Sequence, residues 1–158
     1  MHILGIDPGV ARVGYGILEK NGDTLTHVAH GCIETSLEFS QSERLKIVSD
    51  EIARLIKIYT PELVGIEKLY FQKNVKTAMA VSEGRGVILL ACEMHKLPIL
   101  EFTPMQIKQA VVGYGNAEKR QVQEMVRMLL KLKEIPKPDD AADALAIAYC
   151  AARSIVPK

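Results

Sequence analysis

Four carboxylate side chains stand where apolar segments of the chain begin or end: Asp7, Glu67, Asp140 and Asp143. Ionised carboxylates are costly beside a protein core unless they are paired or bound to a metal. If several of them met at one point, they would repel one another and require a divalent cation. The spacing therefore predicts a metal-dependent enzyme of phosphoryl transfer.

The expected elements explain how these acids could meet. Asp7 ends a first strand and is followed by a Pro8-Gly9 turn, and ligands of open α/β sheets bind at such strand ends. Glu67 ends a later strand, which reaches the same edge if it runs parallel to the first. Asp140 and Asp143 lie three residues apart at the start of a helix and share one face. Taken singly, a turn-forming Asp and acids that complement a helix dipole remain open alternatives.

Oxygen ligands without His or Cys suit Mg²⁺, with Mn²⁺ as a substitute, and argue against zinc. We expect two ions per site, about 3.5–4 Å apart, as in two-metal phosphodiester hydrolysis. Without metal, repulsion should raise the pKa of at least one carboxyl.

The four histidines are not expected to form a set of metal ligands. His27 and His30 lie three residues apart in a strand and should point to opposite faces.

Periodicity predicts the elements in the first half of the chain. Residues 2–7, 13–19 and 24–35 indicate three strands joined by tight turns, an antiparallel meander. Residues 43–59 carry apolar side chains at three- and four-residue steps, which predicts an amphipathic helix. Residues 62–67 form a short apolar run and are expected to be the fourth strand.

The second half predicts βα units. Residues 75–96 read as a helix despite Gly84 and Gly86, with a break at Gly84 as the alternative. Residues 97–102 predict the fifth strand. Helix caps are expected at Thr103, with Gln106 completing a capping box, at Asn116 for a helix to about 133, and at Asp139 for a helix to about 154. The order βββαβαβααα predicts one α/β domain over residues 1–158, a mixed five-stranded sheet with helices on both faces.

Charge is unevenly distributed along the chain. The net charge of +1 combines −4 over residues 1–67, +6 over 68–133 and −1 over 134–158. An acidic site beside a basic segment suits a phosphate-bearing partner. The three cysteines form no C-x-x-C pair, and neither a leader nor a membrane span is evident, so a reducing, cytoplasmic location is expected.

Several residues of the basic segment are candidates for contacts with DNA. Tyr70 and Phe71 follow Glu67 closely, and such rings could stack on unpaired bases while Lys73, Asn74 and Lys76 meet phosphates. Lys108 and Lys119 lie near expected helix starts, where phosphate oxygens bind. The alternatives are a core role for one ring and solvated lysines.

Seven motifs resemble those of the RuvC family of Holliday-junction resolvases, in family order over residues 3–151. They are GIDPG at 5–9, GYG at 14–16, IEKLYFQKN at 66–74, RG at 85–86, KQAVVG at 108–113, AEK at 117–119 with QV at 121–122, and DAADALAI at 140–147. The resemblance implies a ribonuclease H-like fold and a homodimer that nicks opposing strands of a four-way DNA junction symmetrically with Mg²⁺ or Mn²⁺. It also implies the RuvA-RuvB branch-migration motor as a partner.

The resemblance also assigns residues. The four acids match the family's catalytic and metal-binding carboxylates, Lys108 matches a catalytic-site lysine, and Lys119 matches a DNA-contacting lysine. Tyr70 stands at the base-stacking position, where the family commonly has Phe, and Arg85 belongs to a matched DNA-binding motif. A stripe of small residues, Ala78, Ser82 and Gly86, is our candidate dimer interface.

Three other readings compete with a resolvase. An actin-like ATPase would need two lobes and a second glycine-rich phosphate loop, which this sequence does not show. Another nuclease of the same fold, such as one that processes ribosomal RNA, is disfavoured by the Tyr70 segment and the last helix. A non-catalytic junction-binding protein is disfavoured because four intact acids would repel the phosphates.

Overall fold

A computed structural model describes residues 1–9, 11–68 and 75–155, the side chains of 75–77 excepted. Its single sheet has five strands in the order β3-β2-β1-β4-β5. The first three, β1 (His2–Asp7), β2 (Arg12–Asn21) and β3 (Thr24–Glu34), form the predicted antiparallel meander. The other two, β4 (Leu63–Glu67) and β5 (Ile99–Phe102), are parallel to β1. The predicted mixed sheet is confirmed.

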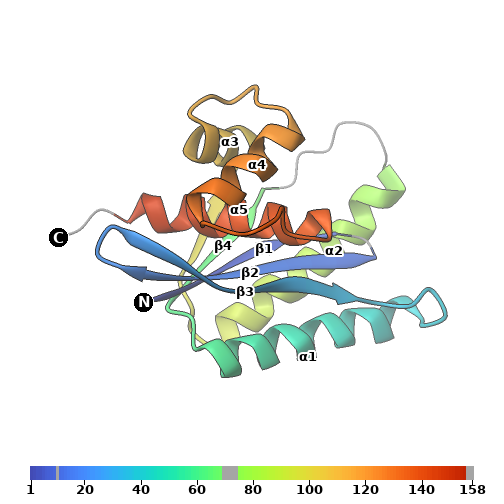
Figure 1. Ribbon diagram of the computed structural model, residues 1–158. Coiled ribbons are helices and arrows are strands. Elements are labelled where there is room, and N and C mark those ends of the chain that lie inside the picture. The colour runs from blue at the N-terminus through green and yellow to red at the C-terminus, as the bar shows by residue number, and fades with distance from the viewer. Residues whose placement is uncertain (10, 69–74, 156–158) are drawn as a thin grey trace.

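Helices cover both faces of the sheet (Figure 1). On one face, α1 (Gln41–Tyr59) and α2 (Val75–Met94) lie over a core that includes Ile6, Ile52 and Ile88. On the other, α5 (Asp139–Ser154) lies directly on the strands, with α3 (Pro104–Val112) and α4 (Lys119–Leu129) beside it. The element order matches the prediction, and α2 continues through Gly84 without a break.

Helix ends follow local chemistry, with two corrections to the predicted caps. Thr103 caps α3 and forms the predicted capping box with Gln106. The N-cap of α4 is Glu118, not Asn116, and this helix ends at Leu129, short of the predicted residue 133. The N-cap of α5 is Pro138, without a side-chain hydrogen bond, so Asp139 is the first helical residue and not the cap. That places Asp139 in the first turn, where its charge complements the helix dipole.

The prediction that His27 and His30 point to opposite faces is wrong. The register of β3 against β2 shifts between Ile17 and Leu18: Ile17 pairs with Ala29, whereas Leu18 pairs with His27. A bulge at residue 28 adds one residue, which reverses the alternation and turns both histidines to the same face.

No helix among the described residues is long and apolar enough to cross a membrane.

Candidate active site

The strand register brings Asp7 and Glu67 to one edge of the sheet. Strands β1 and β4 are parallel neighbours with Ile6 opposite Ile66, so the next residue of each strand is an acid at the same level. Alternation places Asp7 on the same face as Gly5, and Glu67 on the same face as Gly65. Both glycines face α5, so both acids point toward the helix that carries the other two.

Glycines in the strands allow α5 to lie against the sheet backbone. A Cβ atom at Gly5 would stand 2.1 Å from the carbonyl oxygen of Ala144, and one at Gly14 would stand 2.0 Å from that of Asp140. Gly14 is the pairing partner of Asp7 across β1 and β2. The first turn of α5 therefore sits beside Asp7, and the missing side chains of these glycines make that approach possible. The sequence motifs contained these glycines, but their packing role was not recognised.

The carboxyl groups are near enough to shift one another's pKa. The pKa of Asp7 is raised from 3.8 to about 8, by burial first and then by the charges of Asp143, Glu67 and Asp140. Burial and the charge of Asp143 raise the pKa of Glu67. Burial also raises the pKa of Asp143, although Lys119 opposes that shift. The predicted rise in a carboxyl pKa is thus found, and it is largest at Asp7.

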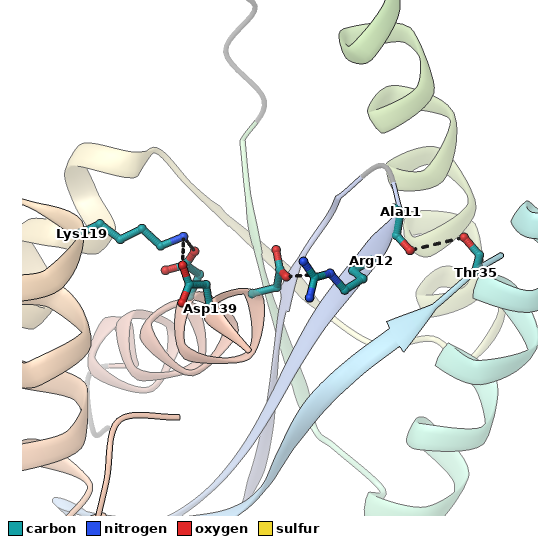
Figure 2. A network of polar contacts seen from close by, with 7 residues as sticks. Ala11, Arg12, Thr35, Lys119 and Asp139 are labelled. Atoms are coloured by element: carbon teal, nitrogen blue, oxygen red, sulfur yellow. Dashed lines mark hydrogen bonds and ion pairs between the residues drawn. The ribbon is translucent and has the colours of Figure 1, made fainter. Parts of the chain in front are cut away.

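Two cations approach the first turn of α5 from opposite sides (Figure 2). Lys119 places its Nζ 3.0 Å from Asp143 Oδ2 and 3.4 Å from Asp139 Oδ2. Arg12 places its Nε 3.5 Å from Asp140 Oδ2. Arg12 was not selected from the sequence, because no pattern marks it without knowledge of the fold, and Asp139 was expected only to cap the helix.

The pKa of Lys119 is raised because its hydrogen bonds and charge interactions with Asp143 and Asp139 outweigh its partial burial, which acts in the opposite direction. Lys119 therefore stays protonated beside the acids. Its contact with Asp143 places the amino group at the acidic site, as a phosphate-binding lysine requires.

Lys108 lies next to the acids as well. A pocket of about 270 Å³ is lined by Glu67, Lys108, Lys119 and Asp143 together with apolar side chains of α3, α4 and α5. The charge of Lys108 lowers the pKa of Glu67. Two lysines facing two carboxylates make a pocket that can hold an anionic oxygen next to the acids.

Of the other predicted DNA-contacting residues, the structure describes the side chain of Arg85 alone. Arg85, on α2, forms an ion pair with Glu101 and donates a hydrogen bond from Nε to the backbone carbonyl of Glu67 at 3.4 Å. It thus links α2 to the end of β4. Tyr70, Phe71, Lys73 and Asn74 lie outside the described residues, as does the side chain of Lys76.

The donor set fits hard divalent cations. Asp7 feels the charges of the other three carboxylates, and such repulsion favours a bound positive charge. In the described part of the chain, no three Asp, Glu, His or Cys side chains already stand as a ligand cluster. Asp140 and Asp143 are instead directed to Arg12 and Lys119.

The raised pKa of Asp7 predicts how stability depends on pH without divalent cations. The folded state holds a proton that the unfolded state releases between pH 3.8 and about 8, so stability should fall as pH rises through this window. Asn has no proton to lose, so the free energy of unfolding of Asp7→Asn should exceed that of wild type by on the order of 2–4 kcal/mol at pH 9 and differ little from it at pH 4. Urea unfolding across the pH range measures the effect; identical profiles for the two proteins would contradict it.

Comparison with known proteins agrees with this geometry. The family model described as crossover junction endodeoxyribonuclease RuvC matches residues 3–151. A protein of that name from Thermosipho melanesiensis is 55% identical, with 96% of this chain and 97% of the relative covered. One from Brevibacillus brevis is 53% identical, covering 94% and 89%.

Solved structures give the same result. Thermus thermophilus RuvC in complex with a Holliday junction superposes with a TM-score of 0.90 at 34% identity, covering 95% of this chain and 92% of that one. The yeast mitochondrial resolvase Ydc2, at 17% identity and a TM-score of 0.68, shares the fold. The predicted ribonuclease H-like fold is therefore confirmed. The chain belongs to the RuvC family of crossover junction endodeoxyribonucleases.

Proposed function

We propose that this chain cuts four-way DNA junctions by hydrolysing phosphodiester bonds at the four-acid site, with Mg²⁺ as its cofactor. The carrying observation is that Asp7 lies beside Glu67, Asp140 and Asp143 at one sheet edge; burial first, and then the charges of these three acids, raise the pKa of Asp7 to about 8. Family membership supplies the reaction class, and the Thermus thermophilus relative was solved with a Holliday junction.

In this proposal Asp7, Glu67, Asp140 and Asp143 would hold the divalent cations, two per site. Such ions would supply the activation of a water molecule and the neutralisation of charge on the leaving 3′ oxygen. Asp7 and Glu67 are fixed by the sheet, whereas Asp140 and Asp143 are fixed by α5. Lys108 and Lys119 would bind phosphate oxygens beside the acids, and Asp139 positions Lys119 through its ion pair.

The test compares substrates. A labelled four-way junction should be cut at two symmetric positions with Mg²⁺ or Mn²⁺, and chelation of the metal should stop cleavage. Equal cutting of linear duplex would refute junction selectivity, and junction binding without any cutting would favour a binding protein. If the protein hydrolysed ATP, the actin-like ATPase would again be a competing interpretation.

Lys119 should matter for catalysis more than its neighbour Arg120. Lys119→Met removes a cation that contacts Asp143, so we expect junction cleavage to slow by about 10- to 100-fold. Arg120→Met, an exposed residue on the same turn, should change the rate little. Single-turnover rates at saturating enzyme measure both; equal losses would show that Lys119 acts through overall charge alone.

We further propose a homodimer in which α2 forms the contact. Met79, Leu90 and Met94 expose 62%, 60% and 74% of their surface on this helix, and Gly86 lies on the same face by helical spacing. A two-fold dimer would present two equivalent sites to two equivalent phosphates of a junction.

Substitution at Gly86 tests this interface. No described atom lies within 4 Å of a Cβ at Gly86, so a leucine there fits the monomer but would obstruct a close helix contact. Gly86→Leu should shift sedimentation from dimer to monomer, whereas Lys57→Leu, on exposed α1 surface, should not. An unchanged dimer would show that α2 does not form the interface.

Two further predictions stay untested. Coupling to a RuvA-RuvB motor is a prediction from the family resemblance, and a cytoplasmic location is a prediction from the sequence.

A further inference from the structure

The histidine pair His27 and His30 is a chemical feature that the four-acid site does not use. His27 Nε2 and His30 Nδ1 lie 2.8 Å apart, and the ring centroids are 4.9 Å apart with planes inclined at 54°. Strand β3 is at the edge of the sheet, and both rings are partly exposed. The pair depends on the bulge at residue 28, since regular alternation would separate the two rings.

We propose that His27 and His30 form a chelating site for one divalent transition-metal ion of the Ni²⁺ or Cu²⁺ class, bound through these two facing nitrogens. Imidazole nitrogen is a preferred ligand of such ions, whereas Mg²⁺ prefers oxygen. The site is therefore chemically distinct from the carboxylates that serve the proposed nuclease reaction, and it does not depend on that proposal.

The distance between the nitrogens selects the coordination geometry. With metal–nitrogen bonds of about 2.0–2.1 Å, a right angle at the metal places two ligand nitrogens about 2.9 Å apart, whereas a tetrahedral angle places them about 3.3 Å apart. The observed 2.8 Å is a hydrogen-bond distance, with the two nitrogens aimed at each other, so both rings must rotate to aim their lone pairs at a shared ion. The spacing itself is closer to that of a right angle, so Ni²⁺ and Cu²⁺ need a smaller change in the distance between the nitrogens than Zn²⁺ does.

The protonation state also suits a metal. Burial lowers the pKa of both rings, and for His27 the charge of His30 lowers it further. Both rings are therefore neutral at pH 7, the form that binds a metal ion. In the hydrogen-bonded pair one facing nitrogen carries a proton. When the ion exchanges two waters for two nitrogens, that proton moves through solvent to the other nitrogen of its ring, so no net proton is released.

Neither of the described residues that pair with His27 and His30 on the neighbouring strand carries a charge. The residues of β2 that pair with His27 and His30 are Leu18 and Gly16. Cys32 follows on the same face two residues beyond His30, but burial raises the pKa of its thiol to about 11, which disfavours the thiolate that metals bind. We therefore assign two protein ligands, with water completing the coordination.

Calorimetric titration with Ni²⁺ tests this site, using protein without a polyhistidine tag and with millimolar Mg²⁺ present to occupy the acids. Wild type should bind one Ni²⁺ per chain. His27→Gln and His30→Gln should each weaken binding by at least about tenfold, because each leaves a single nitrogen in place of a chelate. His95→Gln, an exposed histidine at the end of α2, should bind as wild type does.

Unfolding temperature gives an independent readout. Ni²⁺ should raise it for wild type and not for the double variant His27→Gln/His30→Gln, provided that circular dichroism shows the double variant to be folded. Nickel binding that survives in the double variant, or that is lost in His95→Gln or Cys32→Ser instead, would overturn the assignment. So would the absence of any wild-type binding stronger than that of the double variant.

Discussion

Replacing Asp7 with Asn should slow junction cleavage by about 10³-fold or more, while junction binding stays intact. Asp7 is the acid most strongly coupled to the others, with its pKa raised to about 8 by burial and three neighbouring carboxylates. Asn keeps the shape of the side chain but removes the charge that would hold a cation. Removing that charge should also lessen repulsion of the DNA phosphates, so affinity should not fall.

The matched control is Asp23→Asn, an exposed acid in the turn between β2 and β3. It makes the same chemical change far along the sheet from Asp7 and should cut as wild type does. Single-turnover cleavage and gel-shift binding, measured on one junction, separate chemistry from affinity. Asp7→Asn cleaving within tenfold of wild type would remove Asp7 from the proposed mechanism.

Gly5→Ala should destabilise the fold by at least about 3 kcal/mol and also reduce cleavage. The added Cβ would meet the Ala144 oxygen at 2.1 Å and the Ala148 nitrogen at 2.5 Å, both backbone atoms that cannot rotate away. The helix would have to move off the sheet. Because α5 carries Asp140 and Asp143, that movement would separate them from Asp7 and Glu67.

Two other glycines make this a graded test. At Gly65 the nearest atoms to an added Cβ are side-chain carbons of Ala151 and Ile147, at 3.0 and 3.1 Å, so Gly65→Ala should have an intermediate effect. At Gly84, inside α2, no described atom lies within 4 Å, and alanine should stabilise by up to about 1 kcal/mol. Urea unfolding should rank the variants Gly5, Gly65, Gly84 from most to least destabilised. Any other order would show that close packing of α5 does not control stability.

The sequence was sufficient to predict the order of the elements and the position of the four acids. Strand and helix periods differ clearly in segments such as residues 2–7 and 43–59, and Pro and Gly mark their ends. The acids could be selected because each interrupts or borders an apolar run, where an unpaired charge is unfavourable. The family resemblance then agreed with the same four residues.

Other features needed the three-dimensional arrangement. The bulge at residue 28 has no local sequence signal, so a regular strand was assumed and the histidine pair was missed. Arg12 of β2 contacts Asp140 at the start of α5, and the two residues are far apart in the chain. The cap of α5 was misplaced by one residue because three consecutive positions, Pro138 to Asp140, are all compatible with a helix start.

Titration with Mn²⁺, followed by NMR on the intact protein, tests most directly whether the four acids act as one metal site. Paramagnetic broadening at low Mn²⁺ should affect the backbone signals of Asp7, Glu67, Asp140 and Asp143 together, while those of Asp23 and Asp50 stay sharp. In Asp7→Asn the same broadening should require more Mn²⁺. Broadening spread equally over exposed acids, or confined to the α5 pair without Asp7 and Glu67, would contradict a shared site.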